Sequence, residues 1–148
     1  MKKIALLVMV MALAVAGSSF AANPDFSGKW APKADPNAQA GGGGRGGMGG
    51  GPMTVKQTAT ELTVERTMGD QTMSSVYKLD GTESVNKTQR GESKSTAKFD
   101  GAKLVIKTVQ EGPNGQMETT QAWSLNGAEL TITTTSARGD RTMTYTKQ

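Results

Sequence analysis

The sequence predicts an all-β protein, an antiparallel up-and-down meander of about nine or ten strands that closes or curls into a barrel. The first observation is a series of turn motifs about ten residues apart, and the second is the alternation of apolar and polar side chains between them. Asp-Gly and Asn-Gly pairs supply the positive φ angles of tight hairpins, so consecutive strands fold back on one another. The turn motifs are Gly69-Asp70, Asp80-Gly81, Arg90-Gly91, Asp100-Gly101, Pro113-Asn114-Gly115, Asn126-Gly127 and Gly139-Asp140.

The individual strands are segments whose side chains alternate with a period of two. Threonine is abundant in them, as is typical of a pleated and half-exposed surface. No window has the 3.6-residue period of an amphipathic helix, so we expect no helix in the barrel. The predicted strands are 26–30, 53–58, 62–68, 72–79, 83–89, 92–99, 103–109, 117–125, 130–135 and 141–147.

The alternation gives the sheet one apolar face. An open sheet would leave that face and two unpaired edges in water, so the sheet must close or curl. The apolar side chains expected inside are Val55, Leu62, Val64, Met68, Met73, Tyr77, Leu79, Val85, Phe99, Leu104, Ile106, Met117, Trp123, Leu125, Leu130, Ile132, Met143 and Tyr145.

Three segments are expected along the chain. Residues 1–21 have the charged start and apolar run of a secretory signal peptide, with cleavage after Ala21. Residues 22–52 hold the first short strand and a Pro/Gly-rich loop expected to be flexible, and residues 53–148 form the barrel meander in one domain with strand 26–30. The leader is typical of bacteria, and without cysteine no lipid can be attached at a mature N-terminus. We therefore expect a periplasmic or secreted protein.

Composition excludes several functions. Removal of Lys2 and Lys3 with the leader leaves 15 basic residues against 13 acidic ones, a scattered net charge of about +2 that gives no nucleic-acid footprint. The chain has no histidine or cysteine, which removes the usual general base, the thiol nucleophile and nitrogen- or sulfur-rich metal sites. We expect no cofactor and no metal.

The carboxylates do not form a catalytic pair either. Asp70, Asp80, Asp100 and Asp140 lie in predicted turns, where aspartate is common. Most glutamates fall on the outer face, and only Glu83 is a candidate for the inner one. We therefore expect no catalytic residues and a non-enzymatic protein.

The inner face also carries polar residues, which are Gln57, Arg66, Ser75, Lys87, Ser93, Ser95, Thr119, Gln121, Thr134 and Arg141. Either these lie at the open ends of the barrel, or they line a wet cavity with cationic groups, because a small core does not normally bury an unpaired arginine. A cavity of this kind would suit an amphipathic anion. The residues predicted to contact such a ligand are Arg66, Tyr77, Gln121, Arg141 and Tyr145.

A Gly-x-Trp motif on the first strand, at Gly28 and Trp30, precedes a meander with an arginine near the last strand. This pattern resembles the calycin superfamily of lipocalins, fatty-acid-binding proteins and avidins. The segment 25–30 also resembles small exported bacterial lipocalin-like proteins of unassigned activity. The resemblance implies a lipocalin-like barrel in which Trp30 closes one end near Arg141, with Arg138 as the alternative partner.

The chain departs from this pattern in three places. Met143 stands two residues before Tyr145, where fatty-acid-binding proteins have the arginine of an Arg-x-Tyr pair. The helical lid of those proteins cannot form from the glycines of 41–51, and the C-terminal helix of lipocalins is missing.

Three functions remain open. The favoured one is an exported binding protein that carries or senses a small hydrophobic or amphipathic molecule in the barrel, with an amphipathic anion among the candidates. The alternative is a structural or interaction protein with a filled core and no ligand. An outer-membrane barrel is disfavoured, because the strands are short and no aromatic girdles are present, so we expect no stable membrane insertion.

Overall fold

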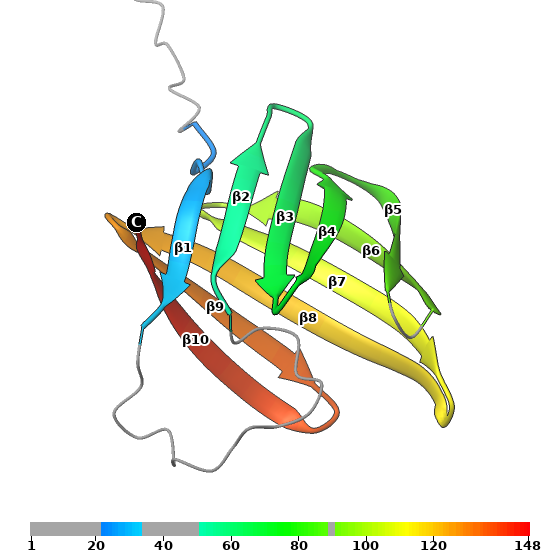
Figure 1. Ribbon diagram of the computed structural model, residues 1–148. Helices are drawn as coiled ribbons and strands as arrows, with labels where there is room; N and C mark the ends of the chain where they lie inside the picture. The colour runs from blue at the N-terminus through cyan, green and yellow to red at the C-terminus, as the bar shows by residue number, and fades with distance from the viewer. Residues whose placement is uncertain (1–21, 34–50, 89–90) are drawn as a thin grey trace, which may run out of the picture.

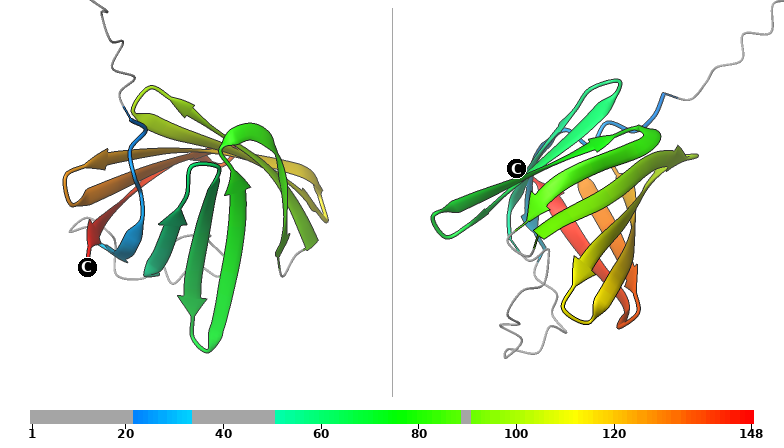
Figure 2. Two further views of the ribbon diagram at one scale, coloured as in Figure 1. Left: turned by 90° about the horizontal axis from the view of Figure 1, so that it is seen from above. Right: turned by 90° about the vertical axis from the view of Figure 1, so that its right-hand side faces the viewer.

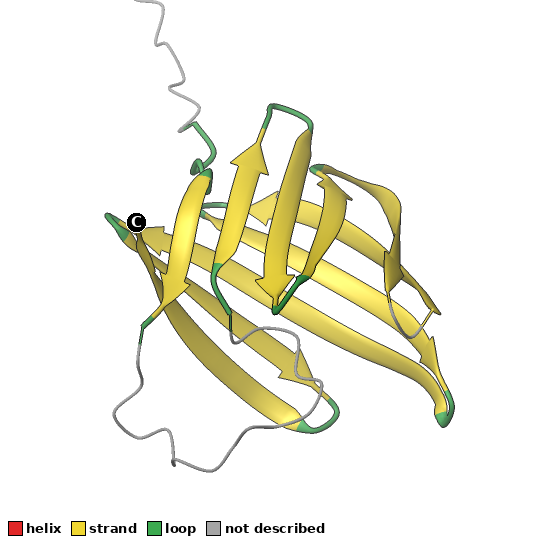
Figure 3. Ribbon diagram, in the orientation of Figure 1, coloured by secondary structure: helices red, strands yellow, loops and turns green. Residues whose placement is uncertain are grey.

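The fold is described by a computed structural model that covers residues 22–33, 51–88 and 91–148. The predicted signal peptide and most of the predicted glycine-rich loop lie outside these residues. Ten strands are present (Figure 1), and the described residues contain no helix (Figure 3), hence none that could cross a membrane. The strands are β1 (Gly28–Pro32), β2 (Met53–Gln57), β3 (Glu61–Met68), β4 (Gln71–Lys78), β5 (Asp80–Thr88), β6 (Gly91–Asp100), β7 (Lys103–Gly112), β8 (Gly115–Asn126), β9 (Glu129–Ser136) and β10 (Gly139–Lys147).

The strands form one antiparallel sheet in the order β4-β3-β2-β1-β10-β9-β8-β7-β6-β5. The first and last strands pair through Trp30 and Lys147, which joins the two halves of the meander. Strands β1 to β4 cross in front of β6 to β10, so the sheet curls into a nearly closed barrel (Figure 1). The prediction of an all-β, up-and-down barrel meander is confirmed.

The predicted turns that lie within the described residues join consecutive strands, whereas Arg90 of the predicted Arg90-Gly91 turn lies outside them. Gly101 and Gly127 have φ angles of 60° and 61° and follow Asp100 and Asn126. These are left-handed conformations that glycine adopts without a steric cost. The Asp-Gly and Asn-Gly pairs therefore end one strand and begin the next, as expected.

The apolar core lies where β1 and the end of β10 meet the central strands. The ring of Phe26 stacks on Phe99, with 6.4 Å between centroids, and meets Trp123 edge to face at 5.9 Å. Trp123 is also buried beside Ile132 in the neighbouring strand. The core residues are Phe26, Trp30, Met53, Val55, Leu62, Val64, Ala97, Leu104, Ile106, Trp123, Leu130, Ile132 and Tyr145.

Strand β5 faces the opposite way from our prediction. Val85 and Lys87 were expected inside and are exposed, with 54% of Val85 accessible, whereas Ser84 and Asn86 are buried. The register with β6 shifts between Asp80 and Glu83, and Glu83 lies outside near Lys94. The physical reason is that β5 is an edge strand whose inward polar groups hydrogen-bond to β4.

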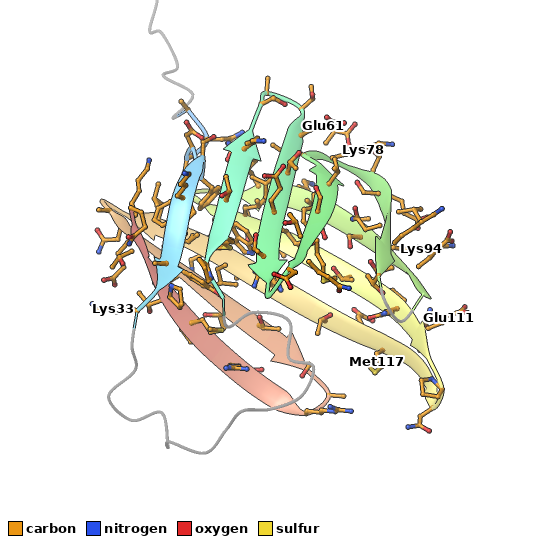
Figure 4. All side chains as sticks on the ribbon, viewed as in Figure 1. Lys33, Glu61, Lys78, Lys94, Glu111 and Met117 are labelled. Carbon is orange, nitrogen blue, oxygen red and sulfur yellow. The ribbon has the colours of Figure 1, made fainter. Side chains whose placement is uncertain are left out.

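Met117 was also expected inside and is 45% exposed. It lies near the free end of the long β7–β8 hairpin (Figure 4), where other strands no longer cover the inner face. The side chain of Met68, another predicted core residue, is outside the described part of the structure.

Candidate ligand site in the barrel interior

Arg66 is the residue that distinguishes the interior from a simple apolar core. It pairs directly with Met53 on one side and Met73 on the other, and Met53 is buried in the core. Because directly opposed residues share a face of a sheet, Arg66 is on the inner face. Its side chain is half-buried, and Nη1 is a fully buried nitrogen with no hydrogen-bond partner among the described residues.

No other buried side-chain nitrogen or oxygen of the described residues lacks a partner. The ion pairs recorded in the same residues join Lys33 with Glu129, Lys56 with Glu65 and Lys94 with Glu83, so none of them compensates Arg66. A buried cationic group with an unused donor is energetically costly. Arg66 therefore presents one unused hydrogen-bond donor of a cationic group to the interior.

Tyr77 lies on the same face as Arg66. It pairs with the buried Leu62 and packs against the core. Burial raises the pKa of the Tyr77 hydroxyl, while a hydrogen bond with Ser75 and the charge of Arg66 act in the opposite direction. The phenol is thus neutral at physiological pH and keeps its proton available for a hydrogen bond.

The polar lining of the interior also includes side chains from the edge strand β5 and its neighbours. Ser84 pairs with Ser95 of β6, and Ser95 pairs with Thr108 of β7. The hydroxyl oxygens of Ser95 and Thr108 are 2.9 Å apart, and both serines are buried. We call Ser84, Ser95, Thr108 and Thr119 the hydroxyl wall, since their side chains are small, polar and in one register across four strands.

Gln121 is the predicted site residue on β8. It is half-buried and pairs with the fully buried Ile106, which places it on the inner face. Its Oε1 accepts a hydrogen bond of 3.1 Å from the indole nitrogen of Trp123. A change at Gln121 would therefore alter the surroundings of Trp123, which lies in the core.

Tyr145 is buried within the apolar core and is not in the polar lining. Its hydroxyl lies 3.8 Å from the sulfur of Met143, to which it donates. The structure thus places Tyr145 among apolar neighbours, on a different strand from Arg66 and Tyr77.

Arg141 does not reach the interior. It pairs with Thr134, on the inner parity, but is exposed. The β9–β10 hairpin extends away from β1 there (Figure 1), so no crossing strand covers it. Of the two arginines predicted to line a cavity, only Arg66 lies inside, and the expected contact of Arg141 with ligand is not supported by its position.

Trp30 meets a lysine rather than an arginine. The Nζ of Lys147 lies 5.7 Å from the centroid of the Trp30 ring, whereas Arg141 is near the opposite end of β10. The indole nitrogen donates a 2.9 Å hydrogen bond to the carbonyl of Phe26. Glycine is favoured at position 28 because its φ is 145°, a backbone conformation that other residues rarely adopt.

Several of these residues were missed or misassigned from the sequence. Ser84 and Asn86 were overlooked because Val85 between them suggested the opposite parity, and Thr108 was not considered. Ser95 and Gln57 were placed correctly on the inner face. Gln57, however, has a structural role, since its amide bridges the Phe26 N–H and the Pro24 carbonyl, each at 2.9 Å.

A separate groove lies on the outside of the sheet. Its volume is about 400 Å³, and it is open to solvent. It sits beside the irregular pairing of β5 and β6. Its lining residues are Gly81, Thr96, Lys98, Phe99, Asp100, Val105 and Lys107. Within the described ranges, no three carboxylates gather in a way that could hold a metal ion.

Comparison with solved structures places the fold in a class. The ten-stranded, nearly closed meander is a calycin-like barrel, as expected. A structure described as the REP1-NXSQ fatty acid transporter is similar, with a TM-score of 0.63 and 14% identity over 82% of this chain and 95% of that one. Secretory abundant heat soluble protein 4 from Ramazzottius varieornatus is similar as well, with a TM-score of 0.59 and 20% identity over 82% and 94% of the two chains. No protein-family model and no curated protein matches the sequence.

Proposed function

We propose that this protein is an exported, non-enzymatic binding protein that holds a small amphipathic anion inside its barrel. The acidic head group of the ligand lies at Arg66, and the apolar part packs toward the core. The observation that carries the proposal is the buried Nη1 of Arg66, which has no partner among the described residues.

The chemistry of the head group follows from the lining. A guanidinium forms short, charge-assisted hydrogen bonds with a carboxylate, and these are stronger than bonds between neutral groups. The neutral hydroxyl of Tyr77 lies on the same inner face and can donate a further bond. An anionic head group would accept a hydrogen bond from the unused donor and pair with the positive charge of the guanidinium.

The apolar part of the ligand would meet Met73 and Met143, which are half-buried on the inner face. Methionine side chains adapt to irregular apolar shapes. A solved structure of similar fold is described as a fatty acid transporter, which makes a long-chain fatty acid the first ligand to test.

The binding test compares three amphiphiles with the same tail and different heads: palmitic acid, its methyl ester and hexadecylamine. The fluorescence of Trp123 reports binding, because its indole bonds to Gln121 in the lining. We expect the acid to bind more tightly than the ester and the amine to bind most weakly. Equal affinity for all three, or none, would contradict the proposal.

The alternative, an interaction protein with a filled interior, gives a different result in this experiment. It predicts no saturable binding of any amphiphile. Export is tested separately, by mass spectrometry of the protein recovered from its own host. A mature chain beginning at Ala22 is expected, and a chain that retains residues 1–21 would contradict export.

A further inference from the structure

The two edge strands of the sheet, β4 and β5, meet without a backbone ladder. They are the first and last strands in the sheet order, so their pairing alone would complete the barrel. In the view from above they diverge after the turn that joins them (Figure 2). We call this junction the β4–β5 seam.

Two side chains of β5 close the seam in place of a ladder. The Val76 N–H donates to Asn86 Oδ1 at 2.8 Å, and Asn86 Nδ2 donates to the Val76 carbonyl at 3.0 Å. The Lys78 N–H donates to Ser84 Oγ at 2.8 Å. The amide of Asn86 thus takes the place of a backbone peptide group, and the hydrogen bonds recorded across the seam depend on the rotamers of these two side chains.

The seam borders the proposed ligand site directly. On one side, β4 places Met73 beside Arg66 and carries Tyr77 on its inner face. On the other side, β5 carries Ser84 of the hydroxyl wall. A molecule that passes between β4 and β5 therefore reaches Arg66 without crossing the core around Phe26 and Trp30.

The other neighbouring strands of the sheet are joined by backbone ladders, which are short on both sides of β1 and shift register once between β5 and β6. The ladder between β7 and β8 runs from Lys103 to Gly112, and that between β9 and β10 covers the length of both strands. Separating such strands would break many backbone hydrogen bonds at once, whereas the seam depends on two side chains. The seam is the one junction of the described barrel that has no backbone ladder.

We propose that the β4–β5 seam is the opening through which the ligand enters and leaves, and that Asn86 and Ser84 hold it closed. The inference rests on the proposed binding function. It assigns to Asn86 a control over the rate of ligand exchange, with little effect on the equilibrium affinity, whereas Ser84 both closes the seam and lines the site.

The test cross-links the seam. The exposed residues Val76 and Val85 lie on the two facing strands, and the chain has no other cysteine, so Val76→Cys/Val85→Cys can be joined by a short reducible bismaleimide. The control joins Thr133→Cys to Thr142→Cys, a pair within the β9–β10 ladder whose hydroxyl oxygens are 3.2 Å apart. Stopped-flow tryptophan fluorescence measures association and release of palmitic acid.

We expect the seam cross-link to slow association and release at least about tenfold, a change of roughly one decade in rate. Cleavage of the linker restores both rates, and the control cross-link changes neither. Asn86→Ala has the opposite effect and speeds release. Unchanged rates in the cross-linked protein would overturn the inference alone, whereas absence of binding before cross-linking would overturn the proposed function with it.

Discussion

The side-chain amide of Asn86 forms two hydrogen bonds with the backbone of Val76, one to its N–H and one to its carbonyl. This pairing satisfies an edge strand that would otherwise offer its backbone to another chain. It also explains why a buried asparagine stands on a strand whose most apolar residue, Val85, faces water.

Asn86→Ala should therefore lower the free energy of unfolding by about 1–3 kcal/mol, because it leaves the Val76 backbone groups without partners. Urea denaturation of the variant and the parent measures the loss. Val85→Ala is the matched control on the same strand and should change stability by no more than about 0.5 kcal/mol, as is usual for exposed positions. Equal effects at the two positions would show that the amide does not close the barrel.

Gln57 should also contribute to stability, because its side chain connects the segment before β1 to the end of β2. Gln57→Glu keeps an acceptor for the Phe26 N–H but, when ionised, cannot donate to the Pro24 carbonyl. We expect this variant to lose about 1–3 kcal/mol at neutral pH and to recover part of that loss in acid, where the carboxyl regains a donor. A denaturation series against pH checks this, and a loss independent of pH would contradict it.

Tyr77 should titrate above the usual pKa of about 10 for tyrosine, because burial raises its pKa. Since the folded state holds this proton more tightly than the unfolded state, the contribution to stability is complete below the unfolded pKa. It is lost as pH rises through the folded value. The chain has two tyrosines, so Tyr145→Phe isolates the absorbance of Tyr77. A Tyr77 that ionises at or below its usual pKa would contradict the described burial.

Much of the fold could be predicted from the sequence because each turn is specified by residues adjacent in the chain. Pairs such as Asp100-Gly101 and Asn126-Gly127 mark each reversal of the chain, and the strands between them follow from alternation. The inner position of Arg66 followed in the same way, from its parity with Val64 and Met68.

The remaining errors have two causes, and the first is that alternation gives the face of a residue but not what covers it. Arg141 and Met117 share the inner parity yet lie where hairpins extend past the crossing strands. On β5 the shifted register and the missing backbone partner made polar Asn86 the inward residue. Both effects depend on contacts between strands distant in the sequence, which local patterns do not contain.

The central claim is that Arg66 receives an acidic head group inside the barrel, and it is tested by the affinities of palmitic acid and its methyl ester for Arg66→Met. The parent should prefer the acid, and the variant should lose about 1.5–3 kcal/mol of affinity for the acid alone, the usual worth of a hydrogen bond to a charged group. Arg141→Met, at the exposed arginine of the same parity, should behave like the parent. If Arg66→Met keeps the preference for the acid, or if Arg141→Met loses it, the account is contradicted.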